Sequence, residues 1–454
     1  MNEHCDILII GAGTAGTYFG WQMAKRGHSV LIAEKDERLR VGKRLDVFHV
    51  DSVKFAEFGI PPPEGAPEFC VILEEGISYS PEGRYPKAVK YPFHVMRLPF
   101  FLQRMFTLAE SGGVRLEFST AFSRLLYEDG RIRGAVVKRG DEEETVQARL
   151  VVDASGIQAV VRTALPPDYG VDNFKIAPDE MFFVVLRYVT WLDARQPRTV
   201  NSEGWTFYKT WVAPSFHERG AIIGVGATGS FDHAEEVFKE FAATITLPPH
   251  QVDKIERGVT PYRRPPYSVV GDGFLCLGDS ACLTKPFSGE GVTSGWTLCK
   301  IAAEVVHQAL QEDDYLAADS LWPVNVRYFR DQGAKFAGIL ATVPSAANAT
   351  KAETSYLFKK DVIFSEADLT DMNRDFEMHL TAWKTLRIFG IIILGLLTGN
   401  YSFASLTALL RSVRISGHIR GHYEDFPETR SDFPSWVGTA EDLWRRANPK
   451  MNGF

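Results

Sequence analysis

Three features are scarce in this sequence: cysteine, excess positive charge and long apolar segments. Only five cysteines occur in 454 residues, and none forms a CxxC pair or a metal-ligand spacing. This excludes a disulfide framework and a cysteine-built metal site, and the odd, scattered set is typical of a reducing cytoplasm. The formal net charge of −7 excludes nucleic acid as the main partner, because phosphate binding needs a basic surface.

Segments long enough to cross a bilayer are also lacking. Ile388–Leu397 (IFGIIILGLL) is almost wholly apolar, but a spanning helix needs about 20 apolar residues. We expect this segment either as a buried helix or as a helix lying at a lipid interface. The first residues, Met1–Asp6, lack the basic region of a signal peptide. The protein is therefore expected to be cytoplasmic, with peripheral membrane contact as the alternative to a fully soluble state.

The chain is too long for one compact core, so two or three structural units are expected. Short strands and helices are expected over about the first 110 residues, and β-strands and hairpins after them. The last of these are a strand over Glu144–Ala148 and a separate buried strand over Leu150–Asp153. From about Asp179 to Phe231 the sequence is rich in β-branched and aromatic residues, which predicts an antiparallel sheet. Beyond about Ala317 the pattern is mostly helical, with a polar, proline-containing tail after Tyr423.

A glycine-rich turn follows the first predicted strand, Asp6–Ile10. It reads Gly11-Ala-Gly13-Thr-Ala-Gly16, opens a predicted helix, and is followed by a second strand that ends before Glu34. Glycines permit the tight turn, the close approach of a diphosphate and close helix packing, and the helix N-terminus attracts the diphosphate charge. The pattern predicts a dinucleotide-binding βαβ unit in which Glu34 accepts the ribose hydroxyls. The residues expected at this half of the cofactor are Gly11, Gly13, Thr14, Ala15, Gly16, Glu34 and Lys35.

A second motif distinguishes FAD from NAD. Residues 278–291 (GDSACLTKPFSGEG) follow a core strand and open another long helix. Asp279 can hold the ribityl hydroxyls, while Gly289 and Gly291 let backbone N–H groups lie against a flat ring. The N-terminus of the following helix would stabilise negative charge on the reduced flavin. The residues expected at the flavin half are Gly278, Asp279, Pro286, Gly289, Gly291 and Val292.

The two motifs, with Asp153-Ala-Ser-Gly156 and Arg162 between them, resemble the glutathione-reductase-type flavoproteins that include aromatic hydroxylases. Within that class, residues 259–305 most resemble the geranylgeranyl reductases and the electron-transfer-flavoprotein–quinone oxidoreductases. The resemblance covers roughly residues 5–310. It implies FAD as the cofactor, with Asp153 and Gly156 among its contacts. Arg44 and Arg97 are candidates for holding the cofactor or an anionic substrate, with surface salt bridging as the alternative.

The pattern and the resemblance together predict an α/β (α+β overall) architecture. A glutathione-reductase-type Rossmann FAD domain is expected in three parts, residues 1–70, 96–165 and 268–316. An inserted antiparallel-sheet substrate domain would comprise residues 71–95 and 166–267. A helical C-terminal region would follow over 317–454.

Two departures from the family pattern bear on the chemistry. Many family members carry a cysteine in the loop after the first βαβ unit, whereas Gly42–Asp46 (GKRLD) contains no thiol here. The quinone oxidoreductases rely on an iron–sulfur module, which this chain cannot build because no cysteine follows Cys299. No metal site is predicted. Since no second GxGxxG motif is evident, electrons are expected from an external donor: NAD(P)H bound transiently, a ferredoxin or a separate reductase.

An aromatic cluster is the candidate substrate site. It resembles the family's substrate-domain motif, reading Tyr208-Lys-Thr-Trp211-Val-Ala-Pro214 and then Gly224-Val-Gly226. An apolar pocket over the flavin is one interpretation of the cluster, and sheet packing is the other. The expected substrate contacts are Trp205, Phe207, Tyr208, Trp211 and Pro214. Tyr208 and Trp211 are the candidate catalytic residues, Tyr208 as a proton donor.

Three functions are compatible with these features. The favoured one is an FAD-dependent enzyme that reduces or dehydrogenates a carbon–carbon bond of a hydrophobic, isoprenoid or lipid-like substrate by hydride transfer at flavin N5. The alternative is an FAD-dependent monooxygenase or halogenase-like enzyme acting on an aromatic or alkene substrate. The third is a non-catalytic flavin-binding or electron-shuttling protein. Oxygen consumption separates the first two, and absence of turnover marks the third.

Overall fold

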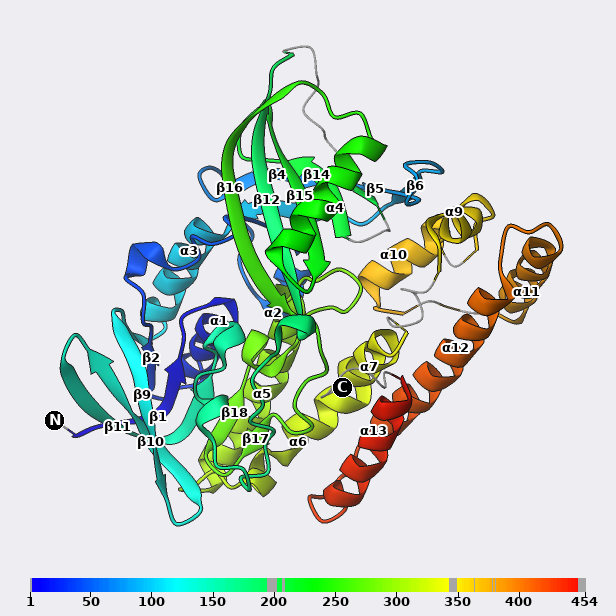
Figure 1. Cartoon of the computed structure of the whole chain (residues 1–454). Helices are drawn as coiled ribbons and strands as arrows, with labels where there is room; N and C mark the ends of the chain where they lie inside the picture. Colours follow the sequence, from blue (N-terminus) through cyan, green and yellow to red (C-terminus); the bar gives the residue numbers. More distant parts are fainter. Residues whose placement is uncertain are drawn as a thin grey trace.

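The computed structural model describes residues 2–193, 202–205, 209–342, 349–362, 364–377, 379 and 381–447. They form a mixed α/β structure with two large sheets, a three-stranded sheet and a group of C-terminal helices (Figure 1). The predicted residues Phe207 and Tyr208 lie outside the described residues.

The first sheet carries both glycine-rich motifs. Its central strands run in the order β18-β11-β1-β2-β8 and are all parallel, while β17, β10 and β9 are added antiparallel. Ile10, Asp153 and Cys276 are aligned across neighbouring strands, so the turns that follow them leave the same edge of the sheet. The strands are β1 (Asn2–Ile10), β2 (Val30–Ala33), β8 (Arg115–Glu117), β9 (Thr120–Glu128), β10 (Arg131–Arg139), β11 (Glu142–Asp153), β17 (Val270–Gly271) and β18 (Phe274–Cys276).

Three helices pack beside this sheet. Most residues of α1 (Thr14–Ala24) are buried, and α1 contacts both α3 (Leu98–Ser111) and α5 (Val292–Glu312). Gly20 of α1 lies close to β2, because a Cβ there would lie 2.9 Å from Ile32 Cδ1 and would push the end of that side chain aside. Close packing of α1 onto β2 therefore helps to position the first motif.

One strand differs from the sequence prediction. Two strands, Glu144–Ala148 and Leu150–Asp153, were predicted, but the structure contains the single strand β11. The polar residue between them, Arg149, does not interrupt it. Its guanidinium instead reaches out of the sheet to the Leu310 carbonyl at 2.9 Å and Asp6 Oδ1 at 3.2 Å.

The second large sheet is antiparallel apart from one pair. Its order is β16-β12-β15-β14-β13-β5-β6, and only β13 and β5 pair in parallel. Helix α4 (Phe231–Thr244) packs on one face, against β12 and β15. The strands are β5 (Gly76–Tyr79), β6 (Lys87–Val89), β12 (Met181–Trp191), β13 (Ser202–Trp205), β14 (Lys209–Pro214), β15 (Gly220–Thr228) and β16 (His250–Pro261).

The other face of the second sheet meets the three-stranded sheet. This small sheet has the order β3-β7-β4 and comprises β3 (Val47–Asp51), β4 (Phe69–Leu73) and β7 (Phe93–Arg97). Val47, Leu73 and Val95 form one buried cluster with Leu186 and Tyr188 of β12. A short helix, α2 (Lys54–Phe58), follows β3.

The chain after α5 is helical, as predicted. Helix α6 packs beside α5, and α12 packs along α7 (Figure 1). The polar tail predicted after Tyr423 contains a helix, α13, that buries Trp436, Ala440 and Trp444 against α12. The helices are α6 (Ala318–Tyr328), α7 (Ala334–Leu340), α9 (Lys351–Lys359), α10 (Glu366–Arg374), α11 (Ala382–Leu397), α12 (Phe403–Glu424) and α13 (Phe433–Ala447).

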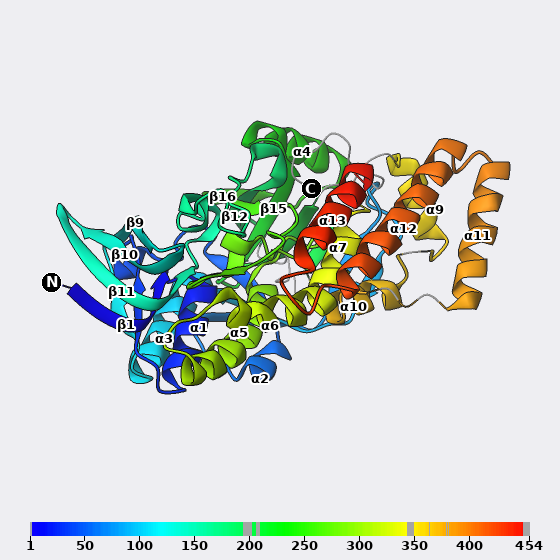
Figure 2. The same ribbon diagram turned by 90° about the horizontal axis from the view of Figure 1, so that it is seen from below.

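Helix α11 contains the apolar segment Ile388–Leu397. It projects at the end of the molecule opposite the N-terminus (Figure 2). The structure does not bear out the buried-helix alternative, because only Ile392 and Gly395 of α11 are buried. Trp383 and Leu397 expose 77% and 81% of their surface. Among the described residues, no helix has both the length and the apolar character needed to cross a bilayer.

Candidate functional site

The first motif forms the tight turn that the sequence predicts. Gly11 has φ +107°, and a Cβ there would lie 2.3 Å from the Ala154 carbonyl oxygen. A Cβ on Gly16 would lie 2.1 Å from the Gly11 carbonyl oxygen. These two glycines are therefore required by the fold itself, whatever the turn binds.

Gly13 is different, and it points to a ligand. A Cβ on Gly13 would meet no atom within 4 Å, so open space lies at the N-terminus of α1. That terminus has no side-chain cap and no acidic residue in its first turn. Free N–H groups facing open space fit the diphosphate of a dinucleotide.

Glu34 lies at the end of β2, beside this turn. Its Oε2 accepts a hydrogen bond from the Ala12 N–H at 2.8 Å, and its Oε1 accepts one from the Asp36 N–H at 2.9 Å. A carboxylate oxygen has a second lone pair, so the side chain is held in place and can still accept from ribose hydroxyls. Lys35, by contrast, is exposed.

The two motifs are in contact. Trp296 Nε1 of α5 donates to the Thr14 carbonyl at 3.1 Å, and Cys299 Sγ lies 3.6 Å from the Ala15 carbonyl. Gly278 has φ +64°, and a Cβ there would lie 3.0 Å from Ala15 Cβ. The loop after β18 therefore packs directly on the first turn of α1, as one extended FAD needs.

Asp279 fits a ribityl-binding role. Burial raises the pKa of its carboxyl to about 6, and the side chain has no hydrogen bond to any residue that the structure describes. A desolvated carboxylate without a protein partner is costly unless a ligand donates to it. Gly291 next to it caps α5 without a side-chain hydrogen bond, and the first turn of α5 has no acidic residue. Pro286, Gly289 and Val292 are half-buried around this loop.

The Asp153 carboxylate holds the loop that follows β11 in place. Its Oδ1 accepts from the Ser155 N–H and hydroxyl, and its Oδ2 accepts from the N–H groups of Val161 and Arg162 at 3.0 and 2.7 Å. The buried Arg162 guanidinium donates to the Ser280 carbonyl at 2.8 Å. Asp153 and Arg162 thus hold the loop at Gly156 against the second motif.

The predicted arginines lie elsewhere. Arg97 donates two hydrogen bonds to Asp46, at 3.1 and 2.8 Å, and its guanidinium lies 4.6 Å from the ring centre of Phe216. Arg44 is exposed. The structure brings neither of them to the two glycine-rich motifs.

A group of ionisable side chains, which we call the polar cluster, lies where β3, β14 and the loop before α5 meet. Lys285 Nζ lies 3.3 Å from Asp51 Oδ2 and 3.4 Å from Glu290 Oε2. Lys209 Nζ reaches Gly289, since a Cβ there would be 3.4 Å from it. His49 Nε2 is buried without a hydrogen-bond partner among the described residues. The members are His49, Asp51, Lys209, Lys285 and Glu290.

Burial and mutual charge set the protonation of the polar cluster. Burial lowers the pKa of both His49 and Lys209. Burial acts against the charge of Glu290, but Lys285, Lys209 and His49 hold the pKa of its carboxyl below its usual range. Burial acts against the charge of Lys285 as well, but the carboxylates beside it raise the pKa of its ammonium. The cluster therefore combines the charged pair Lys285–Glu290 with two basic groups, His49 and Lys209, that release protons more readily than usual.

Sequence reasoning missed the polar cluster. Lys285 and Glu290 lie inside the second motif, where two charges in an otherwise apolar loop were an available signal. His49, Asp51 and Lys209 gave none, because only the tertiary fold brings β3 and β14 to that loop.

The structure separates the predicted aromatic residues. Trp205 stacks on Tyr79, with ring centres 5.1 Å apart, and packs against Phe241 of α4. Trp211 belongs to the opposite face of the second sheet, where a Cβ on Gly224 would lie 2.1 Å from its ring. Lys209 Nζ lies 5.3 Å from the Trp211 ring centre. Trp211 is thus next to the polar cluster, while Trp205 faces α4; Pro214 is buried.

Comparison with known proteins agrees with this geometry. The family model described as FAD dependent oxidoreductase matches residues 6–212. A digeranylgeranylglycerophospholipid reductase of Sulfolobus acidocaldarius is 26% identical over 98% of this chain and 99% of its own length. Digeranylgeranylglycerophospholipid reductase 1 of Methanopyrus kandleri is 28% identical over 69% of this chain and 83% of its own.

Solved structures share the fold. A geranylgeranyl bacteriochlorophyll reductase-like protein from Thermoplasma acidophilum superposes with a TM-score of 0.65 at 16% identity, covering 98% of this chain and 100% of that one. The flavin-dependent brominase Bmp2 superposes with a TM-score of 0.62 at 17% identity, covering 98% and 100%.

The chain is an FAD-dependent oxidoreductase, and FAD is its cofactor. Within that class it is similar to the geranylgeranyl reductases, in agreement with the resemblance that residues 259–305 indicated.

Proposed function

We propose that this enzyme reduces carbon–carbon double bonds in the isoprenoid chains of a glycerophospholipid. The observation that carries this proposal is the similarity, over 98% of the chain, to a digeranylgeranylglycerophospholipid reductase. Trp211 lies beside the polar cluster. Such a reaction needs an apolar side chain to contact the isoprenoid chain and an ionisable group to give a proton, both next to the flavin. Electrons would come from an external donor, NAD(P)H, a ferredoxin or a separate reductase.

We assign the cofactor and the substrate to different sheets. The first sheet, with residues 1–70, 96–165 and 268–316, would hold FAD through Gly13, Glu34 and Asp279. The second sheet, with residues 71–95 and 166–267, would form the substrate domain. The arrangement is supported by the contact of Lys209, on β14, with the Gly289 loop, because it puts a substrate-domain residue at the flavin motif.

When reduced by the external donor, the flavin would supply a hydride to one alkene carbon, and a protein group would give a proton to the other carbon. Tyr208 stays a predicted proton donor. Its neighbour Lys209 is a second candidate, because burial lowers the pKa of its ammonium and makes it a stronger acid. The Glu290 carboxylate would attract Lys209 and His49 and so keep them in place. Trp211 would orient the chain and exclude water from the reacting carbons.

Peripheral membrane contact would supply the lipid. Helix α11 exposes Trp383, Leu386, Phe389 and Ile393 on the outside of the molecule, which is typical of helices that lie in the headgroup–acyl boundary. Binding through one such helix is reversible. A protein that uses it should partition between soluble and membrane fractions and be released without harsh detergent.

The alternative function is oxygenation or halogenation, and the shared fold with the brominase is compatible with it. The test uses FAD-loaded enzyme, reduced under argon and mixed with a detergent-dispersed geranylgeranyl glycerophospholipid. The flavin should be reoxidised without oxygen, and mass spectrometry should find two hydrogens added per reduced double bond. A saturated lipid is the control. Reoxidation only in air, with oxygen consumed in proportion to substrate, would favour the alternative, and no turnover in either condition would favour an electron shuttle.

A further inference from the structure

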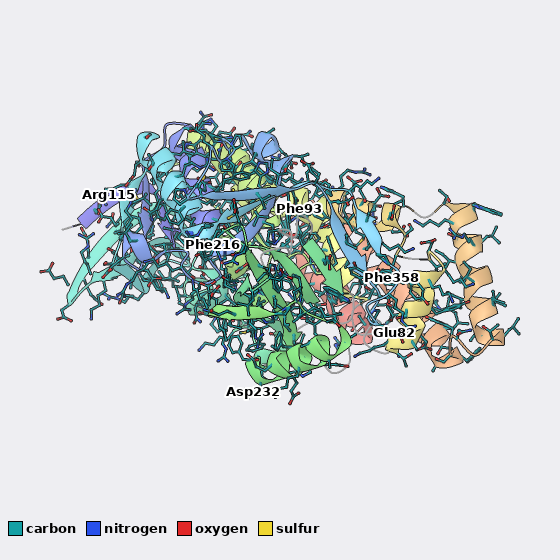
Figure 3. The ribbon with its side chains drawn as sticks, turned by 90° about the horizontal axis from the view of Figure 1, so that it is seen from above. Glu82, Phe93, Arg115, Phe216, Asp232 and Phe358 are labelled. Carbon is teal, nitrogen blue, oxygen red and sulfur yellow. The ribbon has the colours of Figure 1, made fainter. Side chains whose placement is uncertain are left out.

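A pocket lies at the base of α11, away from the flavin motifs. It has a volume of about 330 Å³ and is lined by α9, the C-terminal end of α11 and the turn between β5 and β6, including Tyr85, Ser355, Lys359, Lys360, Leu394 and Asn400. Figure 3 shows Glu82, from that turn, and Phe358, from α9, at the end of the molecule that carries the C-terminal helices. None of the residues that we assign to FAD lines this pocket.

The walls of the pocket are fixed by packing. Gly395 of α11 lies against α9 so closely that a Cβ there would be 2.9 Å from the Tyr356 ring. The Tyr356 hydroxyl donates to the Ile391 carbonyl at 2.9 Å, and Arg387 donates to the Lys360 carbonyl at 3.1 Å. The orientation of α11 relative to α9 is therefore set before any ligand arrives.

The lining has cationic groups without ion pairs and a hydroxyl without a hydrogen bond. Lys359 and Lys360 form no ion pair with any residue that the structure describes, and Lys359 Nζ lies 5.9 Å from the ring centre of Tyr85, another lining residue. Ser355 is 3% exposed, and its Oγ is buried with no hydrogen-bond partner among the described residues. Glu82 is the single acidic side chain among the described lining residues, so the two lysines give the lining a net positive charge. A buried hydroxyl without a partner is costly unless a ligand satisfies it.

The surface around the pocket matches a negatively charged bilayer. From Thr381 to Tyr423 the sequence has no Asp or Glu and five Lys or Arg residues, in a chain with a net charge of −7. Leu394 is 45% exposed and belongs both to the pocket and to the apolar surface of α11. Lys384 and Arg420 of this segment are paired with carboxylates, so the cationic groups at the pocket itself are Lys359 and Lys360. The pocket therefore opens at the edge of the apolar surface and beside two lysines, which is where a lipid headgroup lies when the helix is in the interface.

We propose that this pocket binds the phosphate of an anionic phospholipid headgroup in a membrane, with Lys359 and Lys360 as its cationic contacts. The lipid's chains would lie along the exposed face of α11. The proposal rests on the membrane contact proposed above, and it adds a preference for anionic over zwitterionic lipid. The pocket holds a membrane lipid for docking and takes no part in the reduction.

The experiment measures binding of the FAD-loaded full chain to vesicles of phosphatidylcholine alone and of phosphatidylcholine with phosphatidylglycerol. The double variant Lys359→Gln/Lys360→Gln should lose roughly 10- to 30-fold in affinity for the phosphatidylglycerol vesicles and bind phosphatidylcholine as before. Ala352→Trp, which fills the pocket without changing charge, should also remove the preference. The matched control Lys175→Gln/Lys239→Gln removes two exposed lysines elsewhere and should retain the preference.

Equal binding of the parent and both pocket variants to phosphatidylglycerol vesicles would overturn the proposal. A loss in the lysine variant with none in Ala352→Trp would also overturn it, because diffuse charge would then explain the preference. Titration with inorganic phosphate alone separates the sources: saturable binding without any vesicle preference would overturn the assignment to a lipid. Activity on detergent-dispersed substrate reports the reductase function separately, and the pocket variants should retain it.

Discussion

Lys285 Nζ lies 3.3 Å from Asp51 Oδ2 in a place where both side chains are almost wholly buried. Glu290 completes the arrangement from the other side at 3.4 Å. One buried cation thus lies between two carboxylates at the start of α5 and balances the charge of one of them. Removing the cation would leave the buried Asp51 carboxylate without its partner, which costs far more than losing an exposed pair.

Lys285→Met is therefore expected to lower the free energy of unfolding by about 3–5 kcal/mol. Denaturant unfolding of the FAD-free protein measures it. The control is Lys138→Met, which removes an exposed ion pair with Asp141 and should cost less than about 1 kcal/mol. Equal effects of the two substitutions would contradict the view that the polar cluster is electrostatically interdependent.

Gly13 and Gly16 should respond oppositely to alanine. At Gly13 a Cβ meets nothing within 4 Å, so Gly13→Ala should leave FAD-free stability nearly unchanged. The methyl group would occupy diphosphate space and weaken FAD by about 1–3 kcal/mol, roughly 5- to 150-fold. Gly16→Ala clashes with the Gly11 carbonyl and should instead destabilise the fold. Thermal unfolding and FAD titration separate these effects, and unaltered FAD affinity in Gly13→Ala would contradict the diphosphate position.

Asp279 should make stability depend on pH in the FAD-free protein. The pKa of its carboxyl rises from an ordinary 3.8 to about 6, so the folded state favours the protonated form. Below about pH 4 the carboxyl is protonated in both states and imposes no penalty. As pH rises through about 6 the folded protein must ionise a desolvated group, a loss of up to about 3 kcal/mol.

Asp279→Asn should accordingly raise the Tm of FAD-free protein at about pH 8 and leave it unchanged at about pH 4. In the presence of FAD the same substitution should weaken cofactor binding roughly 10- to 150-fold, because a charge-assisted hydrogen bond contributes about 1.5–3 kcal/mol. Calorimetry at the two pH values and fluorescence titration of FAD test both halves. A Tm that falls at the higher pH would show that a protein group already satisfies the carboxylate.

Substitutions of the two described tryptophans of the aromatic cluster should change different properties: stability for Trp205 and KM for Trp211. Trp205→Ala empties space between the second sheet and α4 and should cost about 3–5 kcal/mol of stability. Trp211→Phe keeps an aromatic ring beside Lys209 and should raise KM for the isoprenoid lipid while FAD content stays constant. Steady-state kinetics together with flavin absorbance distinguish these results. An unchanged KM in Trp211→Phe would remove Trp211 from the substrate site.

Local patterns predicted the cofactor side of the molecule well. Gly11, Gly16 and Gly278 have the conformations or close contacts that their motif implies, because each is dictated by neighbours close in sequence or by the parallel sheet. The predicted break at Arg149 was wrong, since a long side chain can leave a strand without interrupting it. The burial of Trp436 and Trp444, after Tyr423, was not predicted, because it depends on packing against α12.

The substrate side could not be predicted in the same way. His49 and Lys209 become neighbours of the second motif only through the packing of the second and third sheets. Likewise, nothing local distinguishes Trp205 from Trp211, and the pleat of the second sheet decides that one faces α4 and the other faces the polar cluster. Whether Ile388–Leu397 was buried or exposed also depended on tertiary contacts.

The placement of α11 at the end opposite the start of β1 (Figure 2) has a practical consequence for reconstitution. If α11 rests on a bilayer, the amino-terminal end of β1 is held away from the lipid on the aqueous side. A fluorescent protein fused ahead of β1 should therefore leave adsorption unhindered, whereas a bulky group at the turn between α11 and α12 should block it. If the protein were tethered to a solid surface through its amino terminus, α11 would point away from that surface. The tethered molecules would then form an oriented monolayer with their lipid-facing ends outward.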